Sequence, residues 1–298
     1  MSAALPRSPQ SSARLPPLCR HFRYLYYALK PLRAICDHPV LALRRNYHNG
    51  SFDKIKLPEG HLHRPQLRVR ISLLLPTDGQ LTPGRSDHIA ELNNTKPKQP
   101  FFFLKPSSSI LCPGEGPVLR PKGTSLHYEV ELALVMGKKV RDLDPNDEKG
   151  ALDAIQSYLL AIDMTARNVQ DEAKKKGLPW TIAKGFDTFL PVSQEILKSQ
   201  IPDPHNAFLR LSVNSQQRQA DSSGLMLYRI PRLLAEISRV MTLEKGDLVL
   251  TGTPKGVGEV KSGDVMKASI EVDGKEIEQG RIEVEVQDRE GRYEYRET

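Results

Sequence analysis

One stretch of the sequence decides the fold, residues 126–137, LHYEVELALVMG. It begins with polar residues and continues as an unbroken apolar run, which is the pattern of a β-strand that enters a protein core. Because side chains alternate along a strand, Glu129 and Glu131 fall on one face, about 6–7 Å apart, and Val130 on the other. The two carboxylates repel each other, and a bound cation would remove that cost. A solvated strand end with two surface glutamates is the alternative interpretation.

A third carboxylate, Asp163, ends a second apolar run at residues 157–163. If the two strands are neighbours, Asp163 joins Glu129 and Glu131 and completes a set of three oxygen ligands. Hard divalent ions such as Mg²⁺ and Mn²⁺ prefer carboxylate oxygens, and three ligands leave positions for water or substrate. A zinc site is not indicated, because the three cysteines show no paired Cys-x-x-Cys spacing.

Composition narrows the classes of function. The 298 residues are 39% hydrophobic, enough for a core, and no apolar run approaches the length of a membrane span. The net charge of +7 is unevenly placed, since residues 87–298 hold 29 Lys and Arg against 32 Asp and Glu, a net charge of −3. We therefore expect neither a nucleic-acid nor a membrane partner.

The first 36 residues predict a targeting segment. They contain six basic residues among Ser, Pro, Leu and aromatic residues, and no acidic residue precedes Asp37. This composition is typical of a mitochondrial transit segment and predicts a matrix location; a disordered basic tail is the alternative. Residues 37–86 show no sustained period, and we expect an irregular insertion or linker there, with one short strand at 71–75.

A pair of residues three apart follows this segment. Ser86 or Asp87 can cap a short helix, on which His88 and Glu91 share a face. A carboxylate that orients an imidazole makes a general base, so His88 and Glu91 are candidate catalytic residues. An exposed helix end with a casual ion pair remains the alternative.

Further candidates for substrate contacts lie at the ends of predicted elements. Lys105 follows the apolar strand at 101–104, just before a proline. Arg167 and Gln170 share a face of the helix predicted at 165–176, close to Asp163, although an ordinary solvated face is equally compatible. Lys184 could stabilise a developing enolate or be a surface lysine.

The C-terminal third adds a Gly-rich turn at 251–258, TGTPKGVG. It lacks the order of a phosphate-binding P-loop, but its backbone and the Thr253 hydroxyl could hold a carboxylate. Strands are predicted at 208–213 and 247–251, a helix at 225–241, and a hairpin turn at Asp273-Gly274. Strand patterns dominate, so we predict a β-rich α+β fold with few helices.

Together these stretches resemble the fumarylacetoacetate hydrolase family, most nearly its mitochondrial acylpyruvase and oxaloacetate decarboxylase (oxaloacetate tautomerase) branch. The matching pieces follow the family's order: residues 87–91, 103–106, 127–132, 163–167, 170–172, 174–180, 183–184, 201–205 and 251–258. The resemblance implies a catalytic domain over residues 87–298, with a rolled mixed β-sheet, and a homodimer. It also implies roles for ten residues: Mg²⁺ or Mn²⁺ ligands Glu129, Glu131 and Asp163; catalytic His88, Glu91 (on a lid helix) and Lys184; and substrate contacts Arg167, Gln170, Lys105 and Thr253.

The resemblance implies a metal-dependent hydrolase or lyase that acts on small 2-oxo acids. Cleavage of acylpyruvates, decarboxylation of oxaloacetate and its tautomerisation share an enolate that the metal stabilises. A hydratase or isomerase of longer 2-oxo dicarboxylates is one alternative. A catalytically impaired binding homologue is another, because the family segment Gly-Arg-Asn-Tyr-Ala, which directly precedes the Asp-His pair, has a counterpart here only at Arg45-Asn46-Tyr47, about forty residues before Asp87.

Overall fold

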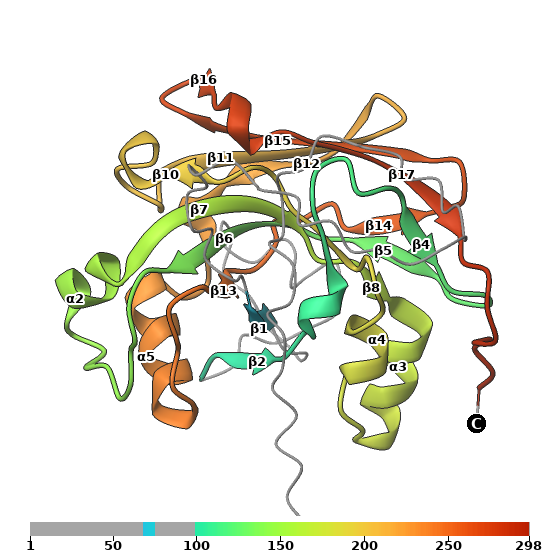
Figure 1. Cartoon of the computed structure of the whole chain (residues 1–298), viewed down its shortest axis with the longest axis horizontal. Helices are drawn as coiled ribbons and strands as arrows, with labels where there is room; N and C mark the ends of the chain where they lie inside the picture. The colour runs from blue at the N-terminus through green and yellow to red at the C-terminus, as the bar shows by residue number, and fades with distance from the viewer. Residues whose placement is uncertain (1–67, 75–98, 298) are drawn as a thin grey trace, which may run out of the picture. The chain divides into compact units, whose positions relative to one another are not determined.

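The computed structural model describes residues 68–74 and 99–297, drawn in colour in Figure 1. Strands dominate this part of the chain and the sheets are mixed, so the predicted β-rich fold with few helices is confirmed. The first six-stranded sheet has the order β10 (Ile196–Leu197), β7 (Ile155–Ile162), β6 (Val130–Met136), β13 (Asp247–Leu250), β1 (Arg68–Leu74) and β2 (Phe101–Phe103). Its neighbours are antiparallel except β1 and β13, which are parallel.

The remaining elements form a second large sheet, two small sheets and the helices. The second sheet has the order β12 (Gln216–Ser222), β11 (Ala207–Val213), β15 (Val265–Val272), β17 (Ile282–Asp288) and β4 (Val118–Arg120), and β16 (Lys275–Glu276) pairs with β15. The small sheets are β14 (Gly258–Val260), β5 (Leu126–Tyr128) and β8 (Thr165–Ala166), and β3 (Ile110–Leu111) with β9 (Leu190–Pro191). The described helices are α2 (Glu148–Asp153), α3 (Arg167–Lys176), α4 (Thr181–Lys184) and α5 (Ile230–Val240), with short 3₁₀ turns at Ser107–Ser109, Lys198–Gln200, Ser223–Leu225 and Glu278–Gly280.

The stretch at residues 126–137 is divided into two strands. The chain leaves the three-stranded sheet after β5 and enters the six-stranded sheet with β6, and Glu129 is the residue between them. Every residue of β6 is buried. Leu132 and Leu134 belong to the main core, whereas Ala133 and Val135 pack into a second apolar cluster on the opposite face. Burial of a Leu or Val side chain contributes about 1.5–3 kcal/mol, so this strand is a major source of stability.

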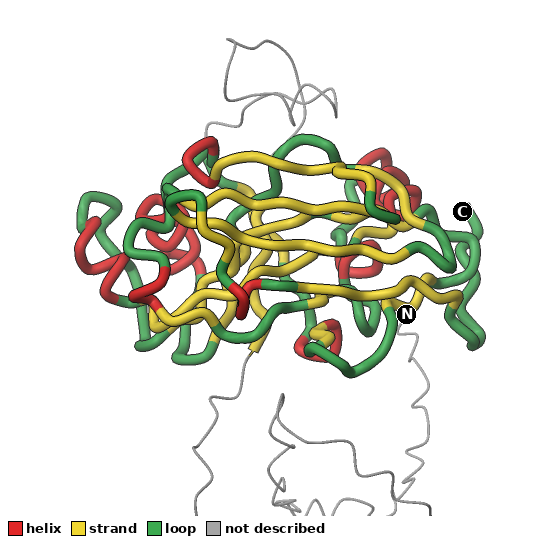
Figure 2. Tube along the Cα trace, turned by 90° about the horizontal axis from the view of Figure 1, so that it is seen from above, coloured by secondary structure: helices red, strands yellow, loops and turns green. Residues whose placement is uncertain are grey.

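The second sheet covers one face of the first. The strand β11 alternates buried and half-buried residues, and its inward side chains, among them Leu209 and Leu211, belong to the same core as Leu132 and Leu134. In the view from above, the long strands of this sheet run side by side (Figure 2). The core therefore lies between the two sheets.

Local sequence signals place several element ends correctly. Gly177 ends α3 in the left-handed conformation, with φ of 65°. The turn at Asp273 and Gly274 has positive φ at both residues and joins β15 to β16. The helix predicted within 225–241, with a break or a start at Pro231, begins at Ile230 as α5, and Pro231 lies in its first turn.

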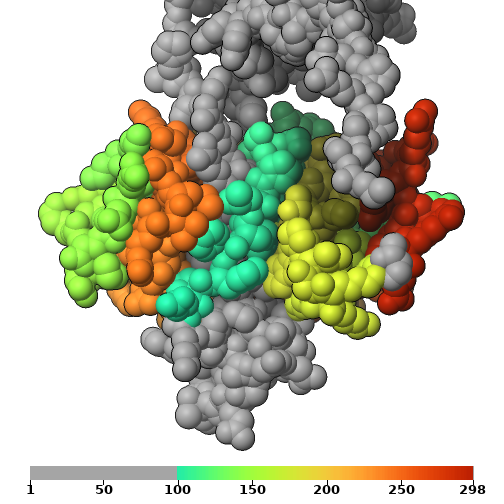
Figure 3. All heavy atoms as spheres, turned by 90° about the horizontal axis from the view of Figure 1, so that it is seen from below, coloured from blue at the N-terminus to red at the C-terminus, as the bar shows by residue number. Residues whose placement is uncertain are grey.

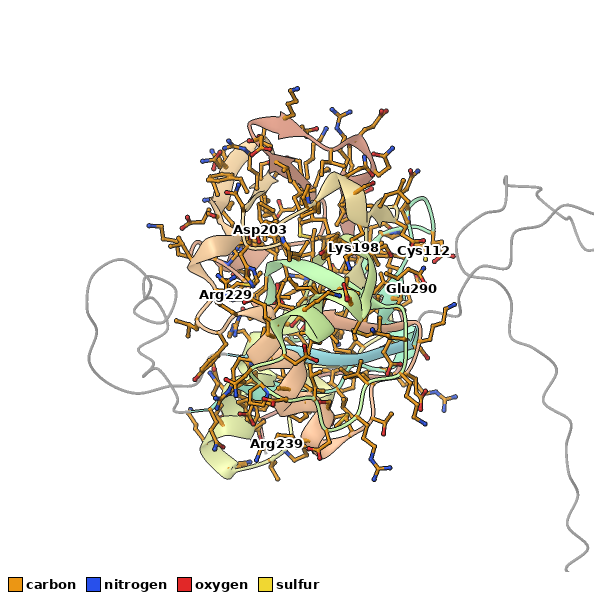
Figure 4. All side chains as sticks on the ribbon, turned by 90° about the vertical axis from the view of Figure 1, so that its left-hand side faces the viewer. Cys112, Lys198, Asp203, Arg229, Arg239 and Glu290 are labelled. Atoms are coloured by element: carbon orange, nitrogen blue, oxygen red, sulfur yellow. The ribbon has the colours of Figure 1, made fainter. Side chains whose placement is uncertain are left out.

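The N-terminus of α5 is held by a histidine. His205 Nε2 accepts the Ile230 N–H at 3.1 Å, and His205 Nδ1 lies 3.2 Å from Asp203 Oδ1. Asp203 and Arg229, labelled in Figure 4, flank this contact. A side chain 25 residues away thus satisfies one of the N–H groups that a helix start leaves unpaired.

The short strand expected at 71–75 is present as β1, Arg68–Leu74, between β13 and β2. A strand from before the predicted boundary at Asp87 is therefore part of the six-stranded sheet. The transit segment 1–36, the rest of 37–86 and the boundary itself lie outside the described residues and stay predictions. In the part of the chain that the structure describes, no helix combines the length and apolarity that a membrane crossing requires.

Candidate active site

Strand pairing brings the three predicted ligand residues together. Because β6 and β7 pair with Val130 opposite Ile162, Asp163 lies beside Glu129, and the Asp163 N–H donates to the Glu129 carbonyl at 2.8 Å. Carboxylate oxygens of Glu129, Glu131 and Asp163 all lie within 4.8 Å of one another. All three side chains are buried. The solvated strand end considered for the two glutamates is therefore not what the structure shows.

Lys184 supplies a cation to this cluster. It is the last residue of α4 and has no exposed surface, so it is not a surface lysine. Its ammonium donates to Glu129 Oε2 at 2.8 Å and to Asp163 Oδ2 at 2.7 Å. Burial alone would lower the pKa of Lys184, but the charges of Asp163 and Glu129 raise it above the usual value. Lys184 therefore remains protonated.

Lys105 lies behind the cluster. Its Nζ forms an ion pair with Asp163 Oδ1 at 2.9 Å and donates to the carbonyls of Met164 and Lys184. The segment that carries it, coloured teal in the view from below, passes between α5 and the α3–α4 pair (Figure 3). An ammonium has three N–H groups, so these contacts occupy Lys105. The structure thus gives it contacts that fix Asp163 and α4, and the substrate contact implied for it stays a prediction.

Arg167 and Gln170 form the helix side of the site. Arg167, the first residue of α3, donates to Glu129 Oε1 at 2.5 Å and to Gln170 Oε1 at 2.5 Å. Both side chains are buried, so a solvated helix face does not describe them. Within residues 68–74 and 99–297, neither Gln170 Nε2 nor Arg167 Nε has a hydrogen-bond acceptor. Buried N–H groups without acceptors are unfavourable, and a ligand with oxygen atoms would satisfy them.

The Gly-rich loop at 251–257 binds a carboxylate of the protein itself. The Gly252 N–H donates to Glu131 Oε2 at 2.6 Å. Thr253 Oγ1 accepts a hydrogen bond from Gln219 Nε2 at 2.8 Å, a contact that no sequence pattern predicted. Gln219 was missed because no local pattern marks it, since it is a polar residue on a largely exposed strand. The predicted Thr253–substrate contact remains a prediction.

The donor set fits a divalent cation. Burial raises the pKa of Glu131 well above its usual range, and the negative charges of Asp163 and Glu129 add to this effect. Among the described residues, Glu131 makes no direct ion pair, whereas Glu129 and Asp163 each have a lysine partner. A cation among the three carboxylates would supply the charge that Glu131 lacks, and oxygen donors suit Mg²⁺ or Mn²⁺. His88 and Glu91 lie outside the described residues.

Residues 83–287 match the family model described as fumarylacetoacetate (FAA) hydrolase C-terminal. This match covers more than half of the chain and contains all ten candidate site residues.

The chain belongs to the fumarylacetoacetate hydrolase family.

Members of the family with high similarity include three mitochondrial proteins. The oxaloacetate tautomerase oaa1 of Schizosaccharomyces pombe is 55% identical over 183 residues, which are 61% of this chain and 83% of that protein. The oxaloacetate decarboxylase of Dictyostelium discoideum is 50% identical over 62% of this chain and 84% of its own length. The oxaloacetate tautomerase FMP41 of Saccharomyces cerevisiae is 43% identical over 71% of this chain and 92% of its own length.

A solved structure of the same family supports the fold. Yeast ynq8, a fumarylacetoacetate hydrolase family protein, superposes with a TM-score of 0.66 at 38% identity, over 77% of this chain and 96% of that one. The family fold that the resemblance implied is confirmed, and the chain belongs to an enzyme family.

Proposed function

We propose that this protein is a divalent-metal-dependent enzyme that interconverts the keto and enol forms of oxaloacetate. The convergence of Glu129, Glu131 and Asp163 in a buried cluster with Lys184 carries this proposal. The names of its relatives support the choice of substrate, since two of the three relatives described above are oxaloacetate tautomerases.

The tautomerisation moves one proton from C3 of the substrate to its carbonyl oxygen, and negative charge develops on that oxygen. Mg²⁺ or Mn²⁺, held by Glu129, Glu131 and Asp163, supplies Lewis-acid polarisation of the carbonyl when bound. Among the described residues, the Lys184 ammonium has only two hydrogen-bond acceptors, which leaves one N–H for a substrate oxygen. Such a fixed donor stabilises developing charge in a site that excludes water.

Residues of α3 would orient the substrate. Among the described side chains, Gln170 Nε2 and Arg167 Nε are buried N–H groups without acceptors, and the carboxylates of a 2-oxo diacid provide acceptors for them. His88, oriented by Glu91, would move the proton, as the family resemblance implies. Lys105 and Thr253 are the remaining residues that we place near the substrate. Lys105 supports the site through its contacts with Asp163 and with the Lys184 carbonyl of α4.

Other reactions of small 2-oxo acids proceed through the same enolate, with negative charge on the same oxygen. Decarboxylation of oxaloacetate is a second candidate, favoured by the 50% identity to the Dictyostelium enzyme. Hydrolysis of acylpyruvates is a third outcome that the same residues would support. A solved 2-hydroxyhepta-2,4-diene-1,7-dioate isomerase from Mycobacterium marinum, 33% identical with a TM-score of 0.58, keeps the isomerase of longer diacids as an alternative.

The test compares four reactions on three substrates with the purified protein. Loss of the enol absorbance of oxaloacetate, pyruvate release from oxaloacetate, pyruvate release from acetylpyruvate, and isomerisation of an unsaturated 2-oxo diacid are measured with Mg²⁺ and with a chelator. We expect the first to be fastest and to stop with the chelator. Rates equal to those of buffer with Mg²⁺ alone, for every substrate, would show a catalytically impaired homologue.

We further propose a mitochondrial matrix location and a homodimer. The three oxaloacetate tautomerases and decarboxylase described above are mitochondrial by name, and residues 1–36 have the composition of a transit segment. Fluorescent fusions with and without residues 1–36 test the location, and light scattering during gel filtration tests the assembly.

A further inference from the structure

The strand β12 contains one polar side chain that is buried although its neighbours on the strand are not. Residues 216–218 are exposed and 220–222 half-exposed, but Gln219 between them has no exposed surface. A buried amide is unfavourable unless its hydrogen-bonding groups are paired. The contacts of Gln219 therefore indicate what it does.

Gln219 connects two parts of the candidate active site. Its Oε1 accepts the Val130 N–H at 3.0 Å, and Val130 lies between Glu129 and Glu131 on the chain. Its Nε2 donates to Thr253 Oγ1 and to the Pro254 carbonyl, both at 2.8 Å. Both amide N–H groups are thus used, and both bind the loop at 251–257.

The backbone of this loop also lies directly against β12. Gly256 has φ of +94°, and a Cβ at that position would lie 2.0 Å from the Arg218 carbonyl oxygen. At its start the loop is anchored to β6, where both the N–H and the hydroxyl of Thr251 bind the Leu132 carbonyl. Between these anchors, the Gly252 N–H reaches Glu131.

We propose that Gln219 is a positioning residue of the candidate metal site. This inference rests on the function proposed above. It connects Val130 to the loop and thereby sets the distance between the loop and β6. At that distance the Gly252 N–H holds the Glu131 carboxylate in the cluster. It acts through these residues and touches neither metal nor substrate. Outer residues that orient metal ligands typically change metal affinity 10- to 100-fold when replaced.

The test uses Gln219→Met, which keeps the length and burial of the side chain but removes its three hydrogen bonds. The matched control is Ser223→Ala, in the 3₁₀ turn that directly follows β12, where a buried hydroxyl accepts the Ala207 N–H at 2.9 Å. Mn²⁺ affinity is measured by calorimetry, and amide exchange of residues 251–257 by mass spectrometry on the metal-free protein. Thr253→Val, which removes one acceptor of Gln219, is the milder variant if Gln219→Met does not fold.

We expect Gln219→Met to weaken Mn²⁺ binding by about 10- to 100-fold and to accelerate exchange in the loop. Ser223→Ala should lower the melting temperature without either effect. Unchanged Mn²⁺ affinity in Gln219→Met, with or without faster exchange, would overturn the proposal. If the wild-type protein itself binds no Mn²⁺, the proposed function fails, and unchanged loop exchange would then separately overturn the role of Gln219.

Discussion

The Lys184 ammonium donates a hydrogen bond to Asp163 Oδ2 over 2.7 Å, and neither side chain has exposed surface. The same ammonium binds Glu129, so a cation of the protein already lies among the carboxylates proposed to hold a metal. Removal of one partner from a buried ion pair leaves an uncompensated charge, which typically costs about 3–5 kcal/mol. The stability of the cluster and its chemistry therefore depend on the same contacts.

Replacement of this cation should make the protein depend on added metal. We expect metal-free Lys184→Met to lose about 3–5 kcal/mol in its free energy of unfolding. With Mg²⁺ added, we expect the variant to lose turnover relative to wild type. Mg²⁺ should raise its melting temperature more than that of the wild type, because the metal restores positive charge near Glu129 and Asp163. Lys175→Met, on the exposed side of α3, is the control and should behave as wild type. Equal Mg²⁺-induced shifts in all three proteins would contradict the prediction.

Asp163→Asn keeps the shape of the side chain but removes one negative charge from the candidate metal site. We expect Mn²⁺ affinity to fall by at least about 10-fold and metal-dependent turnover to be abolished. Calorimetry and the oxaloacetate assay measure the two effects. Asp187→Asn provides a control, since that carboxylate is largely exposed. A variant that binds Mn²⁺ as tightly as wild type would remove Asp163 from the ligand set.

His88→Ala tests the general base that the sequence predicts. We expect turnover to fall by about 10²–10⁴-fold, the usual contribution of a positioned acid or base. Mn²⁺ affinity should not change, because the proposed ligands are Glu129, Glu131 and Asp163. Full activity in this variant would show that another group moves the proton.

The contact of His205 with α5 predicts that stability falls in mild acid. Burial lowers the pKa of His205, and Arg229 lowers it further, against the opposing charge of Asp203. The folded protein therefore favours the neutral imidazole. This contribution is complete above the unfolded-state pKa of about 6.5 and is lost as the pH falls through the folded-state value.

His205→Gln retains an acceptor for the Ile230 N–H but does not titrate. Between about pH 7 and 5, its melting temperature should fall less steeply than that of wild type. Thermal unfolding at several pH values measures the difference. Parallel curves for the two proteins would assign the acid sensitivity to other groups.

Gly256→Ala should destabilise the loop that reaches Glu131. Its Cβ would meet the Arg218 carbonyl oxygen, whereas Gly263 has a similar φ of +90° and nothing within 4 Å of a Cβ. We expect about 1 kcal/mol of destabilisation for Gly263→Ala from backbone strain alone, and roughly 2–3 kcal/mol for Gly256→Ala. Chemical denaturation measures both. Equal losses would show that the loop can move away from β12.

Much of the fold follows from patterns within short segments. The alternation of β11, the apolar runs of β6 and β7, the turn at Asp273-Gly274 and the helix stop at Gly177 were all predictable. The acidic residues of the candidate site could also be named from their positions at the ends of those runs. The division at Glu129 could not, because it arises where the chain changes from one sheet to another.

By itself, the sequence determined which segments form strands, turns or helices, because these preferences depend on residues close together in the chain. It also determined which carboxylates lie at the ends of those segments. Only the tertiary structure decided that Lys105 and Lys184 pair with those carboxylates and that Gln219 binds the backbone between two of them. Their partners lie 21 to 89 positions away, and strand pairing between distant segments sets the distances. Contacts of that range are selected by the burial of whole sheets against each other, which no local pattern encodes.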